Sequence, residues 1–175
     1  GVVQRELEMG ESERPRVLHN KMKQLMFQTH PVRHPTIGYI SVVQHVKREE
    51  VLDFYHNRYV PQNLLFVITG DVKTDEILAA LEKHTQGFHR TTERGVTLAE
   101  ESEQASPRFL KLEMEGATTD LTVAWPTIPL QHPDLYALDV ASFILTNGES
   151  SRLVRKLRVE RPLVSSVDSA SYTPG

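Results

Sequence analysis

The first ten residues carry the pattern of an amphipathic helix that begins without a start signal. Val3 and Leu7 are four residues apart, and Val2 and Met9 extend the same apolar stripe. No Ser, Thr, Asp or Asn precedes the stripe to cap the helix. We therefore expect the first domain to be truncated at its N-terminus. Glu6 lies at the edge of the stripe, where a carboxylate is usually solvated but can also face a cleft.

Composition excludes several classes of function. With 39% apolar and 25% charged residues, the 175-residue chain can form a core, and general disorder is not expected. A net charge of −3 without a dense Lys/Arg run argues against nucleic-acid or anionic-membrane partners. No apolar run approaches the roughly 20 residues that cross a bilayer. Because cysteine is absent, only the eight His and the carboxylates could bind a metal. The compartment is not predicted.

The first piece, residues 1–90, is predicted to be mixed helix and strand. Apolar periodicity predicts helices over 12–27, 47–59 and 74–86, and a buried strand over 64–70. The strand and the helix after it lack the Gly-rich loop of a nucleotide site. His30 and His34 are four apart, but Pro31 and Pro35 exclude the helix that would align them as a metal pair.

Residues 91–106 are polar and aperiodic, which predicts a linker between the first piece and a second one over 107–175. Alternating apolar residues predict strands over 110–115, 121–125 and 164–172, and helices are expected over 133–147 and 150–158. The expected fold is α+β: two related pieces, each an antiparallel sheet with helices on one face, the second truncated at its C-terminus.

Four segments in order suggest a family. They are Gly1-Val-Val-Gln-Arg-Glu6, His30-Pro-Val-Arg-His34-Pro-Thr-Ile-Gly38, Tyr59-Val-Pro-Gln-Asn63 ahead of 64–71, and Gly148-Glu-Ser-Ser-Arg152-Leu153 with Leu157-Arg158. Together they resemble the pitrilysin/insulinase family of zinc metallopeptidases, which includes the mitochondrial processing peptidases. The resemblance covers almost the whole chain and implies one half of a clamshell.

The resemblance implies a zinc site to which this chain contributes one ligand. In that family a His-x-x-Glu-His helix and a distal Glu bind Zn²⁺, one position stays open for water, and the Glu inside the motif takes the proton of that water. By similarity Glu6 matches the distal ligand. The chain contains no His-x-x-Glu-His, so we expect the isolated chain to bind no zinc and to be inactive, whatever the parent does.

Arg158 is a second candidate, on the substrate side. In the non-catalytic half of these proteases an Arg and a Tyr seven residues later bind the substrate backbone; here Arg158 is followed seven residues later by Ser165. The retained Glu6 and the missing Tyr indicate a piece of the catalytic half. The alternative interpretation of Arg158 is a helix-end cation that interacts with the helix dipole.

The leading hypothesis is a fragment of a zinc endopeptidase that closes around short or unfolded peptides. Its second half would lie in the same parent chain or in a partner subunit, and truncated apolar surfaces predict a possible homodimer. One alternative is a non-catalytic structural or assembly subunit of the same family, and another is a peptide-binding module. An intact His-x-x-Glu-His upstream of Gly1 would separate the enzyme from the non-catalytic subunit.

Overall fold

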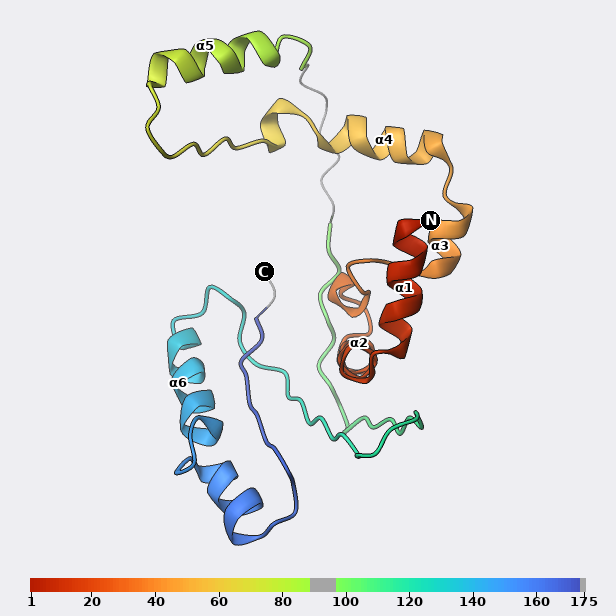
Figure 1. The fold of residues 1–175 in the computed structure, drawn as a ribbon, viewed down its shortest axis with the longest axis vertical. Coiled ribbons are helices and arrows are strands. Elements are labelled where there is room, and N and C mark those ends of the chain that lie inside the picture. The colour runs from red at the N-terminus through yellow and green to blue at the C-terminus, as the bar shows by residue number, and fades with distance from the viewer. Residues whose placement is uncertain (89–96, 174–175) are drawn as a thin grey trace.

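Helices are the only regular elements that a computed structural model of the chain shows in the residues it describes, 1–88 and 97–173. Figure 1 shows α4 and α5 at one end of the molecule, α6 at the other, and α1, α2 and α3 between them. The helices and helical turns are α1 (Val2–Ser12), α2 (Arg14–Met26), η1 (Pro31–Arg33), α3 (Ile40–His45), α4 (Arg48–Arg58), η2 (Pro61–Asn63), α5 (Thr74–His84), α6 (Leu135–Thr146) and the π-helical η3 (Val154–Glu160).

The expected α+β fold is wrong for this structure. Within 1–88 and 97–173 no residue belongs to a β-strand, and the four predicted strands, 64–70, 110–115, 121–125 and 164–172, are irregular chain. A strand is stable only when its amides and carbonyls pair with a neighbouring strand. These segments lack that partner, and their apolar side chains are largely solvated: Leu65 is 88% exposed and Leu121 86%.

The first helix pair confirms the uncapped start. Gly1 occupies the N-cap position of α1, and no side chain bonds to the free amides there. Pro15 lies in the first turn of α2, where its missing amide costs nothing, and the chain becomes extended at Phe27. Helix α1 contacts α2 and α3. Gly10 permits a close approach, because a Cβ at this position would lie 2.8 Å from Cζ of Arg16.

Helix ends elsewhere follow the expected electrostatic pattern. Helix α4 begins with Glu49 and Glu50, and the Glu50 carboxylate accepts a bond of 2.8 Å from the backbone amide of Lys47. Helix α5 begins at Thr74, because Lys73 occupies the N-cap position. Helix α6 ends at Thr146 with Asn147 as its C-cap, and the next residue, Gly148, has a φ of +87°.

Little apolar surface is buried in the described chain. The buried hydrophobic side chains are Leu7 on α1, Val60 ahead of η2, and Val154 on η3. Outward faces of the helices carry large apolar groups, for instance Tyr136 and Phe143 of α6, which are 78% and 61% exposed. None of the described helices is long and apolar enough to cross a membrane.

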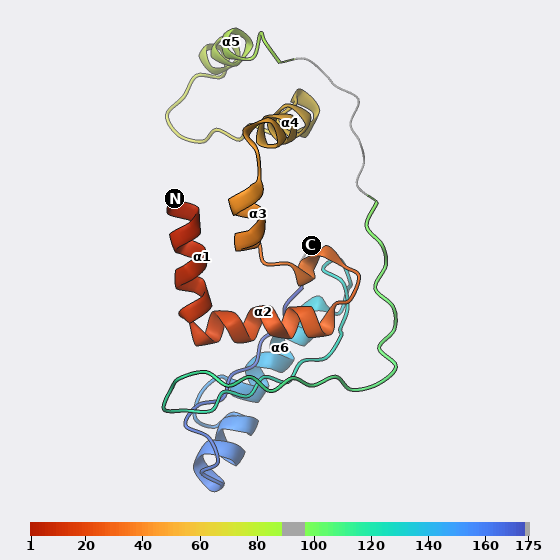
Figure 2. The same ribbon diagram turned by 90° about the vertical axis from the view of Figure 1, so that its right-hand side faces the viewer.

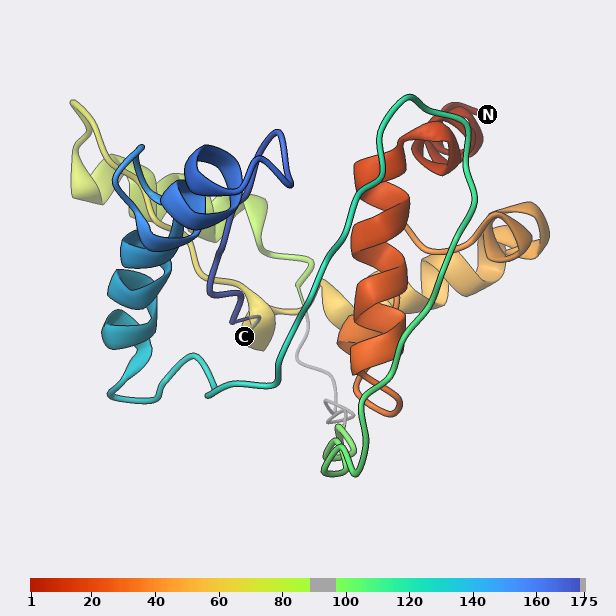
Figure 3. The same ribbon diagram turned by 90° about the horizontal axis from the view of Figure 1, so that it is seen from below.

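Residues 101–120 lie against α2. Two extended limbs run along this helix and are joined by bends at 115–118 (Figures 2 and 3). Residues of these limbs form bonds with both ends of α2.

Candidate functional site

Glu6 lies in the second turn of α1 and its side chain is exposed. The next residue, Leu7, is only 8% exposed, so the helix is anchored directly beside the carboxylate. The neighbouring Glu8 accepts a bond of 3.0 Å from the amide of Gln4. Glu6 itself forms no hydrogen bond or ion pair with any residue of the described ranges, which leaves both carboxylate oxygens open to an external ligand.

A zinc ion needs three or four protein ligands around one point. Across residues 1–88 and 97–173, no group of three or more His, Asp or Glu side chains could hold a metal ion. These residues therefore do not fit a zinc ion on their own. Glu6 can supply one ligand at most.

His30 and His34 have other partners. Nδ1 of His30 accepts the amide of Val32 at 3.2 Å, which caps η1. Nδ1 of His34 lies 2.8 Å from the hydroxyl of Tyr39. Each imidazole thus stabilises the irregular chain between α2 and α3, where the prolines prevent an α-helix.

Arg158 lies in the last turn of η3 and is paired with a carboxylate. Its Nη2 donates to Oε1 of Glu149 at 2.7 Å. Glu149 belongs to the Gly148–Leu153 segment, so this ion pair joins two parts of the family-like pattern. Ser165 lies in irregular chain beyond η3. The structure does not bring Glu6 and Arg158 together, because α1 and η3 lie in different parts of the molecule (Figure 1).

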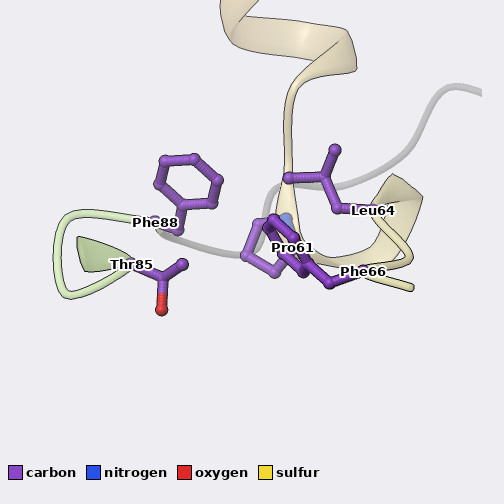
Figure 4. A pocket seen from close by; sticks show the side chains of 5 residues that line it. All are labelled: Pro61, Leu64, Phe66, Thr85 and Phe88. Carbon is purple, nitrogen blue, oxygen red and sulfur yellow. The ribbon is translucent and has the colours of Figure 1, made fainter. Parts of the chain in front are cut away.

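A shallow hollow of about 330 Å³ lies between η2 and the end of α5 (Figure 4). It is lined by Pro61, Leu64, Phe66, Thr85 and Phe88. The hydroxyl of Thr85 donates to the carbonyl of Leu81 at 2.7 Å. Since the lining contains no acid, base or metal ligand, the hollow can offer apolar contact but no proton transfer.

Glu101 forms the densest set of polar contacts that sequence reasoning missed. Its carboxylate accepts the backbone amides of Gln28 at 2.7 Å and of Thr29 and His30 at 2.8 Å each. These bonds lower the pKa of Glu101 from 4.5 to about 2, and the bond from the His30 amide has the largest effect on it. The residue lies in the segment predicted to be a polar linker, where nothing in the sequence indicates a bond to amides 71 to 73 positions earlier.

The lowered pKa of Glu101 predicts a pH dependence. The bonded state of Glu101 has a lower pKa than the free carboxyl group. Its bonds to the three amides therefore stabilise the fold fully at pH values above the ordinary pKa of 4.5, and this stabilisation is lost as the pH falls toward 2. A carbon NMR titration of the carboxyl groups should show one resonance with a midpoint near 2. Glu101→Gln should remove that resonance, and a Glu101 midpoint near 4.5 would contradict the contacts.

A comparison of the sequence with family models decides which family this is. Residues 45–174 match the model described as the peptidase M16 inactive domain. The chain belongs to the peptidase M16 family. This confirms the pitrilysin/insulinase resemblance, since zinc proteases and a solved protease are among the matching proteins.

Individual relatives of this M16 chain are distant but cover nearly all of it. It is 28% identical over 182 residues to an uncharacterized zinc protease of Mycobacterium leprae, a match that covers 97% of the chain and 38% of the relative. It is 25% identical over 146 residues to a non-peptidase homolog of Helicobacter pylori, covering 83% of the chain and 34% of the homolog. The chain thus spans well under half the length of these relatives.

A solved structure has a similar fold. The crystal structure of a protease from Helicobacter pylori superposes with a TM-score of 0.72 at 21% identity, covering 98% of this chain and 43% of that protease. At this identity the likeness concerns the fold alone. The matches assign no role to Glu6 or Arg158, and both remain predictions.

Proposed function

We propose that this chain is part of a zinc-dependent endopeptidase of the M16 family that cleaves short peptides or unfolded segments. The family match supports the reaction class. The single observation that carries the site is the unpartnered carboxylate of Glu6 on a helix anchored by Leu7. In this proposal Glu6 is one zinc ligand, and the remaining ligands come from residues outside this chain, since those described here do not form a set.

The proposal assigns the chain to the catalytic half of a clamshell, with domains over 1–90 and 107–175 and a linker over 91–106. A second half, in the same parent chain or in a partner subunit, would cover apolar surface that is solvated here. The outward face of α6 supports this, because Tyr136, Val140 and Phe143 follow helical spacing and are 78%, 58% and 61% exposed. A homodimer formed through such faces would also cover this apolar surface.

We propose Arg158 as a candidate residue on the substrate side. Its side chain is 42% exposed while Nη2 is paired with Glu149, and the guanidinium has further donors beyond the one in this pair. The ion pair supports the interpretation of Arg158 as a structural cation equally well, and Arg158 is therefore not assigned a catalytic role.

The second candidate function is a non-catalytic subunit of the same family. The matching family model is that of the inactive domain, and one relative is a non-peptidase homolog. The unpartnered Glu6 favours the enzyme, since a metal-free paralogue does not need a carboxylate at that position.

The test of the proposed function uses the whole protein that carries this chain. The purified protein should cleave an unfolded polypeptide, lose the activity on treatment with a chelator, and regain it when zinc is added. A whole protein that takes up no zinc and cleaves nothing would overturn the enzyme and support the non-catalytic subunit.

The isolated 175-residue chain is predicted to behave differently from the whole protein. Isothermal titration should show no stoichiometric binding of zinc, and incubation with unfolded polypeptide should give no cleavage, because a lone carboxylate does not hold zinc at catalytic strength. Glu6→Ala is the matched variant. Tight binding of zinc that this variant abolishes would show that further ligands lie on the chain.

A further inference from the structure

The end of α2 depends on side chains from a distant segment. The last carbonyls of a helix have no partner within the helix. At this end, Nη1 of the half-buried Arg108 donates to the carbonyls of Leu25 and Met26, each at 2.9 Å. A guanidinium at this position also complements the negative end of the helix dipole.

The chain immediately after α2 is held by the opposite charge. Three consecutive amides, those of residues 28–30, point at one carboxylate, that of Glu101. Successive amides directed at one point form a concave site for an anion. Arg108 therefore satisfies the last two carbonyls of α2, and Glu101, seven residues earlier in the same segment, satisfies the amides of the chain that follows.

The other end of α2 contacts the same segment. Arg14, the first residue of α2, donates from Nη2 to the carbonyl of Thr118 at 2.6 Å and forms an ion pair with Asp120. A Cβ at residue 116 would collide with the Arg14 guanidinium, so Gly116 permits this approach. Since α2 has 13 residues, the two anchored ends are about 20 Å apart.

We propose that residues 101–120 form a strap, anchored to both ends of α2, that fastens the chain after residue 97 to the N-terminal helices. The observation behind it is that side-chain contacts join one segment to both ends of one helix. The backbone of the segment runs along the same helix (Figures 2 and 3). Between the anchors the side chain of Phe109 is 93% exposed. This inference does not depend on zinc or on peptidase activity.

The strap makes the amides of residues 28–30 reporters of its docking. Hydrogen exchange by NMR would be measured on the 175-residue chain and on Glu101→Gln, whose side chain has nearly the same shape but lacks the charge and presents an NH₂ group. We expect exchange of these three amides to be about tenfold faster or more in the variant, because bonds to a charged acceptor are the strong ones. Glu100→Gln is the matched control: Glu100 is exposed and, within the described residues, bonds to nothing.

A protease gives an independent readout between the anchors. Chymotrypsin should cut after Phe109 faster in Glu101→Gln than in Glu100→Gln, because cleavage needs several residues around the bond to leave their docked position. Exchange of the α5 amides, which lie away from the strap, should be unchanged in both variants. Unchanged exchange at 28–30 in Glu101→Gln, or no protection of these amides in the unsubstituted chain, would overturn the proposal.

A substitution at the other anchor, Arg14, tests the proposal even if Glu101→Gln unfolds the whole chain. Arg14→Gln removes the contacts with Thr118 and Asp120 while leaving Glu101 and Arg108 in place. It should accelerate cleavage after Phe109 and leave the amides of residues 28–30 protected. Cleavage at the same rate as in the unsubstituted chain would overturn the proposal that the strap is anchored at Arg14.

Discussion

Leu7→Ala is expected to lower the free energy of unfolding of this chain by about 2 to 4 kcal/mol, in the range of buried Leu→Ala substitutions. The residue is 8% exposed, and Val60 and Val154 are the other buried apolar side chains of the described residues. With so few buried groups, each one contributes a large part of the apolar burial that stabilises the chain, and the free energy of unfolding of a domain is only about 5 to 15 kcal/mol. Helix α1, which carries Leu7, contacts α2 and α3.

Urea denaturation followed by circular dichroism measures this effect. Met9→Ala is the matched control, because Met9 lies on the same helix, is 64% exposed and has a helix propensity close to that of leucine. The control should change the free energy of unfolding by less than about 0.5 kcal/mol. Equal shifts of the urea midpoint in Leu7→Ala and Met9→Ala would show that α1 is not held by Leu7.

Helices were predictable here because their signals are local. The period of the apolar residues predicted helices over 47–59 and 74–86, and the structure has α4 at Arg48–Arg58 and α5 at Thr74–His84. Helix α3, Ile40–His45, was missed. It has only six residues, too few for a periodic pattern, and it follows directly on the irregular chain around Gly38.

The predicted sheet failed because a strand is a property of two segments. The alternation of apolar and polar residues over 110–115 and 121–125 indicates which side chains could share one face of a strand. It does not indicate which other segment will pair with the backbone of that strand. In the structure these segments run along α2, and residues that flank them, Arg108 and Thr118, bond to the two ends of that helix. Trp125, the last residue of the predicted strand over 121–125, is 71% exposed.

Long-range polar contacts were equally invisible to the sequence. Glu101 stood in a run of polar residues that gave no reason to single it out, and its partners are backbone amides, which carry no sequence signal. The pair of Arg158 and Glu149 is nearer, nine residues apart, but this spacing lies outside the i,i+3 and i,i+4 rules that apply to a regular helix. Glu6 was found only because the ordered family-like segments drew attention to it.

Glu6→Gln in the whole protein is expected to reduce both zinc content and kcat/KM by about 100-fold or more. The estimate is a lower bound, since even residues that only support a metal ligand change affinity or activity by about 10- to 100-fold. Glutamine keeps the shape and hydrogen-bonding capacity of the side chain but is a poor zinc ligand. Because Glu6 is exposed and without a bonded partner in the described chain, the substitution should leave the fold of α1 intact.

Two comparisons separate a ligand from a merely structural carboxylate. Glu8→Gln, two residues along the same helix, changes a side chain whose described contact is with Gln4, so zinc content and kcat/KM should stay near those of the unsubstituted protein. The thermal midpoint of the isolated 175-residue chain should be the same with Glu6→Gln as without it. Zinc measured by mass spectrometry, together with kcat/KM, decides the matter: a Glu6→Gln protein that retains both would remove Glu6 from the site, while a loss that Glu8→Gln reproduces would point to helix charge instead of metal ligation.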